Sequence, residues 1–452
     1  MAKWKIIVLA GGKGTRMMSS NPKVLQKLCG KEMLNLVLAN VSSVIDGEYY
    51  VVVPPEYDLI KKAVNQQVKY VTQSEPKGTG HAVEVALEYC DKVENILVIN
   101  GDVPLIENST IDAMVTSHLR SNAALTLLTA DLSEPKTLGR VIRDKNGIVK
   151  EIVEVADKYD IESTDMTEIN SGVYCFNKNV LEVNLGKLRK SESGEMYLTD
   201  IIKMLSGQGE LIETIRLKNV ERVIFGIDTK IDLERGNSVL QNRILDRFML
   251  EGVTIQNRNA TYIDYDVKIG EDTIIMPNTH ILGNSEIGNN SIIGPNSIID
   301  SSKIGNNCNI LSSTINDSII SNNVIVGPFS NVRINSYLDD NVHLGTSAEV
   351  NRSKLGKGTK SSHFSYLGDA LVGNNVNIGA GTVTCNYDGS NKNTTIIGDN
   401  AFIGSGTLLV APVKVGRKAS TGAGSVVLQD VDEESRVAGV PAKSISKQTE
   451  IN

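Results

Sequence analysis

Residues 269–299 read IGEDTIIMPNTHILGNSEIGNNSIIGPNSII, with an isoleucine at every sixth position. The same period returns, after slips of register, in residues 320–350 and 397–427. It fits neither an amphipathic helix, which repeats about every 3.6 residues, nor a lone strand, which alternates. A period of six predicts a parallel β-helix of hexapeptide repeats, with Gly and Asn at the tight turns. The side chains expected to point inward are Ile269, Ile275, Ile281, Ile287, Ile293, Ile299, Ile320, Val326, Val332, Leu338, Leu344, Val350, Ile397, Ile403, Leu409, Val415, Thr421 and Val427.

The first half of the chain has a different rhythm. Short apolar runs such as KIIVLA (5–10) and NILVI (95–99) alternate with segments of helical spacing. This predicts strand–helix–strand units and a mostly parallel sheet covered on both faces. Ligands bind beyond the carboxyl ends of the strands in such sheets. We expect helices near 31–41, 56–66 and 79–90, a first domain over 1–228, a linker helix over 229–251 and a β-helix domain over 252–452, whose polar tail KSISKQTEIN (443–452) is loosely ordered.

Composition excludes several classes of protein. A chain of 452 residues suggests roughly two to three domains. Its net charge of -7 argues against a nucleic-acid partner, which requires a basic surface. Its five cysteines are odd in number and widely spaced, which indicates neither a disulfide framework nor a zinc site and fits a reducing cytoplasm. No run approaches the roughly 20 apolar residues of a membrane span.

A glycine-rich segment, LAGGKGTRM (9–17), follows the first predicted strand. Its spacing matches neither the P-loop nor the dinucleotide fingerprint, because Met17 occupies the position of the last glycine. Its backbone N–H groups could still hold phosphate oxygens, with Lys13, Arg16 and Lys23 supplying positive charge. Taken alone, the segment is as compatible with a surface turn.

Three further segments support a ligand site: QSEPKGTGHA (73–82), NGDVPLI (100–106) and INSGVY (169–174). Asp102 stands just past an apolar strand, where an isolated Asp is usually a helix cap or turn residue. Near a phosphate loop it becomes a candidate Mg²⁺ ligand, because Mg²⁺ is commonly held by one or two carboxylates and substrate phosphates. Asn170 is expected at the end of another strand.

These segments, together with PKVL, YLTDII, SHFSYLGDA and NYDG, resemble the bacterial bifunctional N-acetylglucosamine-1-phosphate uridylyltransferase and glucosamine-1-phosphate N-acetyltransferase family over nearly the whole chain. The resemblance implies a Rossmann-like nucleotidyltransferase domain, a left-handed parallel β-helix and a homotrimer. It also implies two reactions. In the C-terminal domain, acetyl-CoA acetylates glucosamine 1-phosphate. In the N-terminal domain, Mg²⁺-dependent uridylyl transfer from UTP to N-acetylglucosamine 1-phosphate releases pyrophosphate and forms a precursor for peptidoglycan and lipopolysaccharide.

The resemblance carries roles onto residues of the first half. Arg16 and Lys23 are expected to stabilise the charge of the displacement. Asp102 and Asp228 are expected to hold the metal; Asp228 stands in GID, where the family has Asn. The residues expected to bind UTP are Leu9, Ala10, Gly11, Gly12, Lys13, Lys23, Gln73, Gly78 and Thr79, beside Gly14 in the phosphate loop. Those expected to hold the N-acetylated sugar phosphate are Gly139, Glu154, Asn170 and Thr199.

In the second half, the resemblance makes His363 the general base that deprotonates the amine of glucosamine 1-phosphate, with Glu349 orienting it. An imidazole suits this task because it normally titrates near neutral pH. The residues expected to hold glucosamine 1-phosphate are Arg333, Asn351, Tyr366 and Asn377. Those expected on the acetyl-CoA side are Ala380, Asn386, Tyr387, Ser405 and Ala423; Asn386 also matches a sugar-phosphate position.

The chain departs from the family pattern at two places. Asn351 stands where the family has a lysine that contacts the sugar phosphate. Arg352 is next to it, but side chains at adjacent strand positions point to opposite faces, so Arg352 is not expected to replace that lysine automatically. AGVPAK (438–443) lacks an arginine that meets the coenzyme, and Arg436 and Lys443 are the candidate substitutes.

Two other interpretations stay open at this point. The chain could be a single-activity sugar-1-phosphate nucleotidyltransferase whose β-helix serves only oligomerisation. It could also be a non-enzymatic structural or ice-binding β-helix. Ice binding would require long outward arrays of threonine, which the sequence lacks.

Overall fold

The computed structural model describes residues 4–133, 135, 138–154, 167–191, 194–218 and 226–445. They form two compact units, one up to Leu240 and one from Gln241, which divide inside helix α7 (Lys230–Leu250). Helix α7 spans most of the segment, 229–251, for which a linker helix was predicted. The end of the polar tail, residues 446–452, lies outside the described residues. Within the described part of the chain, no helix has the length and apolar character that crossing a membrane requires.

The first unit is built on a sheet with the strand order β11–β7–β10–β6–β1–β4–β5. Neighbouring strands on this path pair in parallel except at β10, which runs antiparallel to both β6 and β7. The mostly parallel sheet is thus confirmed, with one reversed strand. Its strands are β1 (Trp4–Leu9), β4 (Gly47–Val53), β5 (Lys69–Thr72), β6 (Asn95–Asn100), β7 (Leu125–Asp131), β10 (Glu168–Asn177) and β11 (Ile212–Leu217), and the hairpin β8 (Arg140–Arg143) and β9 (Val149–Val153) pairs with β10.

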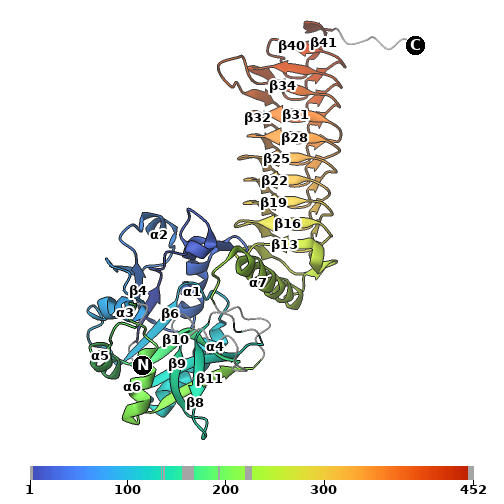
Figure 1. Cartoon of the computed structure of the whole chain (residues 1–452). Helices are drawn as coiled ribbons and strands as arrows, with labels where there is room; N and C mark the ends of the chain where they lie inside the picture. The colour runs from blue at the N-terminus through green and yellow to red at the C-terminus, as the bar shows by residue number, and fades with distance from the viewer. Residues whose placement is uncertain are drawn as a thin grey trace. The chain divides into compact units, whose positions relative to one another are not determined.

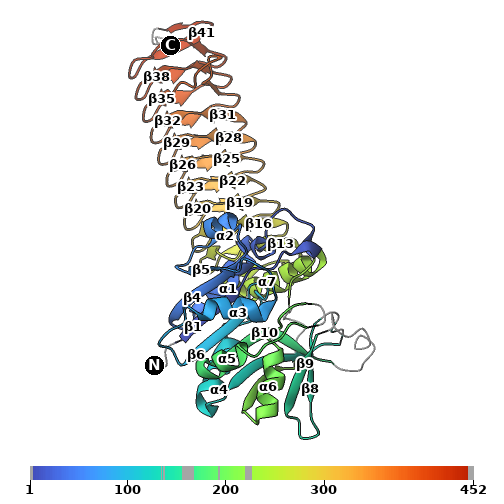
Figure 2. The same ribbon diagram turned by 60° about the vertical axis from the view of Figure 1, so that its left-hand side comes forward.

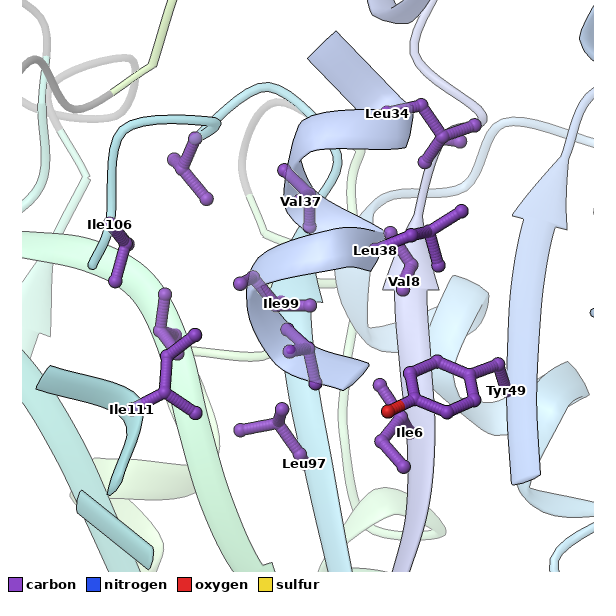
Figure 3. Close-up of a cluster of buried hydrophobic side chains, with 14 of the residues drawn as sticks. Ile6, Val8, Leu34, Val37, Leu38, Tyr49, Leu97, Ile99, Ile106 and Ile111 are labelled. Atoms are coloured by element: carbon purple, nitrogen blue, oxygen red, sulfur yellow. The ribbon is translucent and has the colours of Figure 1, made fainter. Parts of the chain in front are cut away.

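Helices cover both faces of this sheet because its strands are apolar on both sides. Along β1, Ile6 and Val8 join one buried cluster, whereas Ile7 joins another on the opposite face. Figure 3 shows Leu34, Val37 and Leu38 of α1 packed over the first cluster. The helices are α1 (Met33–Ser42) and α4 (Asn108–Ser121) on that face, α3 (Thr79–Leu87), α5 (Lys178–Leu185) and α6 (Asp200–Gln208) on the other, and the short α2 (Asp58–Ala63). The three predicted helices are present, each with shifted or shorter ends.

The second unit is a left-handed parallel β-helix, and its short strands stack into three faces (Figures 1 and 2). The first face contains β12 (Thr254–Ile255), β15 (Ile274–Ile275), β18 (Ile292–Ile293), β21 (Asn309–Ile310), β24 (Ile325–Val326), β27 (His343–Leu344), β30 (Lys360–Ser361), β33 (Asn377–Ile378), β36 (Phe402–Ile403), β39 (Ser420–Thr421), β41 (Arg436–Gly439) and β42 (Ala442–Ser444).

The second face contains β13 (Thr261–Ile263), β16 (Thr279–Leu282), β19 (Ile298–Asp300), β22 (Thr314–Asn316), β25 (Asn331–Arg333), β28 (Ala348–Asn351), β31 (Ser365–Gly368), β34 (Val383–Cys385), β37 (Leu408–Val410) and β40 (Val426–Val427). The third face contains β14 (Lys268–Ile269), β17 (Glu286–Ile287), β20 (Lys303–Ile304), β23 (Ile319–Ile320), β26 (Tyr337–Leu338), β29 (Lys354–Leu355), β32 (Ala370–Val372), β35 (Thr395–Ile397) and β38 (Val413–Val415).

Every side chain predicted to point inward is buried, with at most 9% of its surface exposed. Thr421 is tolerated inside because its hydroxyl accepts from the backbone N–H of Gly404 at 3.0 Å and shares a hydrogen bond with Thr407. The register slips because some turns are a residue shorter: after Ile299 the next buried isoleucine is Ile304, not residue 305. Asparagines with positive φ, such as Asn290 at 56°, form the tight turns as expected.

His118 of α4 gives the first unit a predictable pH dependence. The ring is 2% exposed, packs 5.8 Å from the ring of Trp4, and hydrogen-bonds Thr126 at 3.0 Å. Burial lowers the pKa of His118 to about 4. The unfolded chain therefore binds more protons between its ordinary pKa of about 6.5 and pH 4. We expect the free energy of unfolding to fall as the pH is lowered through this window, by up to about 1.4 kcal/mol per pH unit.

Urea unfolding of the first unit at pH 7 and pH 5 measures this loss. His118→Gln should weaken the pH dependence, and His280→Gln, at an exposed position of β16, should leave it unchanged. Equal pH dependence in wild type and His118→Gln would show that the buried imidazole does not contribute.

Candidate active sites

The ends of β1, β4 and β6 meet at one edge of the first unit's sheet. Leu9 at the end of β1 is in register with Val52 of β4 and Asn100 of β6. Because β10 is reversed, its first residues reach the same edge, and Val173 pairs with Ile99. Two cavities of about 500 and 290 Å³ open here and share lining residues. The edge is where parallel sheets bind ligands.

The larger cavity is lined by every residue that the family resemblance assigns to UTP. Gly78 shapes one wall: its φ is 102°, and a Cβ there would lie 2.5 Å from the carbonyl oxygen of Met196. Gln73 is buried, and its Nε2 donates to the carbonyl of Gly78 at 3.1 Å. The assigned residues along this cavity are Leu9, Ala10, Gly11, Gly12, Lys13, Lys23, Gln73, Gly78 and Thr79.

Gly14 sets the path of the glycine loop. Its φ is 58°, and a Cβ there would lie 2.5 Å from the Cβ of Lys23. Gly14→Ala should therefore strain the backbone and displace Lys23, and we expect the KM for UTP to rise roughly ten-fold or more. Steady-state pyrophosphate release measures the effect. The control is Gly207→Ala in α6, where a Cβ meets nothing within 4 Å; an unchanged KM in Gly14→Ala would contradict the role of the loop.

The smaller cavity is lined by the four residues assigned to the N-acetylated sugar phosphate. Oγ1 of Thr199 donates to Glu154 at 2.9 Å. A Cβ on Gly139 would lie 3.1 Å from the other oxygen of Glu154, so glycine leaves room for this carboxylate. The amide of Asn170 donates to the hydroxyl of Tyr174 at 2.6 Å, and burial raises the pKa of Tyr174. The cavity thus presents ordered polar groups to a ligand.

Lys23 lies where the two cavities meet. Its ammonium contacts Asp102 and lies 2.5 Å from Oδ1 of Asp228, which is 205 residues away in the sequence. Arg16 lies 2.9 Å from the other oxygen of Asp228. Burial alone would lower the pKa of Lys23, but the two carboxylates outweigh this and raise it. Lys23 and Asp102 therefore line both cavities, and Arg16 and Asp228 line the smaller one beside them.

Asp102 and Asp228 are the side chains that could hold a divalent cation. One oxygen of Asp102 is buried and has no hydrogen-bond partner in the described residues, which suits a cation ligand. Within the described ranges, no group of three or more His, Cys, Asp or Glu side chains is arranged to hold a metal ion. The pair therefore fits Mg²⁺, which commonly takes one or two carboxylates and completes its shell with phosphate and water.

In the second unit, the residues assigned to the coenzyme stack along the corner between the first and second faces. The N–H of Gly406 donates to the carbonyl of Ala380 at 2.7 Å, and the N–H of Gly424 donates to Ser405 at 2.7 Å. Ala423 directly precedes Gly424, so Ala380, Ser405 and Ala423 lie in one column on successive coils. The column therefore presents a regular backbone edge to a ligand.

His363 lies on the same corner, one coil earlier. The N–H of Gly381 donates to the carbonyl of Phe364 at 2.7 Å, which aligns this turn with the column. A buried hydrogen bond of 2.7 Å between the hydroxyls of Ser361 and Ser365 closes the turn from inside. His363 itself is exposed. The imidazole is therefore presented to solvent from an ordered turn.

A second group of assigned residues lies on the second face. Glu349 is in register with Tyr366 and accepts from Arg333 at 2.6 Å; in the described residues this arginine, and not His363, is its partner. Asn351 is buried and in register with Gly368. A Cβ on Gly368 would lie 2.5 Å from the hydroxyl of Tyr366. The absence of a side chain thus lets the phenol lie against the strand.

The remaining assigned residues lie in three places. Asn386 is buried at the start of the loop between β34 and β35, whereas Tyr387 is 61% exposed. Asn377 lies on β33 of the first face, apart from the group on the second face. Arg436 and Lys443 lie on β41 and β42 of the last coil.

The structure also reveals residues that the sequence did not single out. Asn100 lines both cavities of the first unit, and a Cβ on Gly172 would lie 2.2 Å from its amide nitrogen. Its place beside Gly101 and Asp102 was the available signal. In the second unit, Asp369, which the sequence did not single out, forms an ion pair with Arg352 among the assigned residues. They are 17 residues apart, which is one coil of the β-helix.

Comparisons with known proteins agree with the motifs. The nucleotidyl transferase family matches residues 5–220, and the bacterial transferase hexapeptide family (six repeats) matches residues 266–301. The chain is 44% identical over 432 residues to the bifunctional protein GlmU of Thermosipho africanus (strain TCF52B), covering 95% of this chain and 93% of the relative. It is 41% identical to that of Geobacillus sp. (strain WCH70), covering 100% and 97%, and 42% identical to that of Clostridioides difficile (strain 630), covering 95% and 94%. The chain therefore belongs to the GlmU family of bifunctional proteins, and the resemblance found in its motifs is confirmed.

Proposed function

We propose which residues carry out the two reactions of this enzyme. The protein makes UDP-N-acetylglucosamine in two steps: N-acetylation of glucosamine 1-phosphate in the β-helix, then uridylyl transfer to the acetylated product in the first unit. The product serves peptidoglycan synthesis. The observation that carries the assignment is the shared wall of the two cavities, because a nucleotide and a sugar phosphate bound on either side meet at Lys23.

In the first unit, UTP binds in the larger cavity and N-acetylglucosamine 1-phosphate in the smaller one. A phosphate oxygen of the sugar phosphate attacks the α-phosphorus of UTP, the bond to the β-phosphate breaks, and pyrophosphate leaves. Phosphoryl transfer of this kind depends on positioning and charge stabilisation. Lys23, at the shared wall, and Arg16, in the smaller cavity, release the carboxylate of Asp228 and bind the phosphate oxygens.

Asp102 and Asp228 hold Mg²⁺ when it is bound, and the ion neutralises the phosphate charge that develops during the displacement. The support is the buried, unpartnered oxygen of Asp102 and its closeness, through Lys23, to Asp228. Glu154, Asn170 and Thr199 orient the sugar, with Gly139 leaving space beside Glu154.

In the second unit, His363 takes a proton from the amine of glucosamine 1-phosphate as the amine attacks the thioester carbonyl of acetyl-CoA. The C–N bond forms, the C–S bond breaks, and free coenzyme A leaves as a thiol. The column of Ala380, Ser405 and Ala423 binds acetyl-CoA, together with Asn386 and Tyr387. Arg333, Asn351 and Tyr366 hold the sugar phosphate from the second face.

Asn377 supports a homotrimer as the working form. It lies on the first face, whereas Arg333, Asn351 and Tyr366 lie on the second, so one chain does not gather all four. Adjacent copies packed side by side join a first face to a second face and complete the site. The enzyme works on small molecules in the cytoplasm.

Two product assays test the assignment on the full-length protein. Acetyl-CoA and glucosamine 1-phosphate should yield free thiol, and UTP, Mg²⁺ and N-acetylglucosamine 1-phosphate should yield pyrophosphate. Thiol release without pyrophosphate, or pyrophosphate without thiol, would remove one half of the proposal. The second outcome would support a nucleotidyltransferase whose β-helix serves only oligomerisation.

A further inference from the structure

Arg352 occupies a corner of the β-helix, not a strand. β28 ends at Asn351, and Arg352 has a φ of 52°, in the left-handed region. Its N–H donates to the carbonyl of Ile334, at the same corner one coil earlier, at 3.1 Å. The alternation of strand side chains therefore does not apply to Arg352. The sequence-based expectation that its side chain faces away from Asn351 is wrong for this reason.

The guanidinium turns back toward Asn351 and is held there. Nε and Nη2 donate to the two oxygens of Asp369 at 2.7 and 2.8 Å, and Nη1 donates to Oδ1 of Asn351 at 3.0 Å. Asp369 also accepts from the side-chain amide of Asn386. Arg352 is 27% exposed and Asp369 17% exposed as side chains. The pair is thus a half-buried, bidentate bridge between two residues assigned to substrates.

This bridge keeps Arg352 charged and oriented. The hydrogen bonds that Arg352 donates to Asp369, helped by the charge of the carboxylate, raise the pKa of Arg352 above its ordinary value, and the same bonds lower the pKa of Asp369. A guanidinium has five N–H groups. Three are used in the contacts within the described residues, so one N–H on each Nη nitrogen remains for an acceptor.

The surroundings favour a phosphate as that acceptor. The hydroxyl of Tyr366 lies against Gly368, the strand neighbour of Asn351, and Asn351 accepts a hydrogen bond from the Arg352 guanidinium. Asn351 itself contributes no charge. The other arginine of the group, Arg333, is bonded through both Nε and Nη2 to one oxygen of Glu349. A dianionic phosphate here needs a second fixed cation, and planar guanidinium groups bind phosphate in a bidentate manner.

We propose that Arg352, positioned by Asp369, binds the phosphate of glucosamine 1-phosphate in the acetyl-transfer site. This rests on the proposed function of the second unit and adds two residues to it: Arg352 as a substrate-binding residue and Asp369 as a positioning residue. The carboxylate of Asp369 prevents the arginine from swinging into solvent and ties it to Asn386, which borders the coenzyme.

The test uses steady-state thiol release by the full-length enzyme. Arg352→Gln should raise the KM for glucosamine 1-phosphate roughly ten- to hundred-fold, with kcat and the KM for acetyl-CoA little changed. Arg352→Lys should have an intermediate effect, because lysine keeps the positive charge but lacks the planar guanidinium that binds in a bidentate manner. The double variant Asn351→Lys/Arg352→Gln moves the cation by one residue and should recover most of the affinity. An unchanged KM for acetyl-CoA confirms that the β-helix of the variants folds.

Each alternative outcome contradicts the proposal. An unchanged KM for glucosamine 1-phosphate in Arg352→Gln would overturn it while wild-type thiol release still supports the proposed function. A rise only in the KM for acetyl-CoA would place Arg352 on the coenzyme side. A loss of kcat that Asn351→Lys does not rescue would indicate a purely structural ion pair. Absence of thiol release from wild type would remove the proposed function itself.

Discussion

His363→Ala is expected to slow acetyl transfer to glucosamine 1-phosphate by roughly 10²- to 10⁴-fold, the usual contribution of a general base. The amine must lose a proton as it attacks the thioester, and the exposed imidazole of His363 stands on the corner where the coenzyme column begins. Thiol release measures the loss. Pyrophosphate release by the first unit should stay at the wild-type rate, because His363 lies in the second unit.

A matched control is His343→Ala. His343 lies on β27, one coil before the strand that precedes His363, and its side chain also points outward. The His343→Ala variant should retain normal thiol release if activity depends on an imidazole at the corner and not on an imidazole elsewhere in the β-helix. Retention of more than about a tenth of wild-type turnover by His363→Ala would contradict general-base catalysis by this residue.

Asp102→Asn is expected to reduce Mg²⁺-dependent pyrophosphate release by at least about a hundred-fold. The substitution keeps the shape of the side chain but removes the charge at a buried oxygen that has no partner in the described residues. It also leaves Lys23 with Asp228 as its remaining carboxylate. Thiol release should be unaffected. Direct titration with Mn²⁺ should show weakened binding, which separates loss of metal from misfolding.

Asp112→Asn, on the exposed side of α4, serves as the control for a charge change elsewhere in the first unit. It should leave both activities intact. Near-normal uridylyl transfer by Asp102→Asn at saturating Mg²⁺ would show that Asp102 is not a metal ligand.

Sequence motifs predicted most of the residues that line the first unit's cavities, but not how they are assembled. Asn170 was expected at the end of a strand; it lies near the start of β10, and it reaches the ligand edge because that strand is reversed. Asn100 was not predicted although it stands beside Gly101 and Asp102, because one asparagine after an apolar strand does not by itself indicate a ligand-binding residue. Its role emerges only where β6 and β10 meet.

The sequence alone determined the β-helix, because each coil repeats the same local geometry. An inward-pointing aliphatic residue therefore recurs about every six positions. All the predicted inward side chains are buried for this reason. Only the tertiary structure showed that Lys23 lies between Asp102 and Asp228. These contacts join segments that are distant in the sequence, and no periodic pattern predicts them. Only the tertiary structure, likewise, showed that Arg352 turns back toward Asn351, because a single left-handed residue at a corner cancels the alternation that a strand would impose.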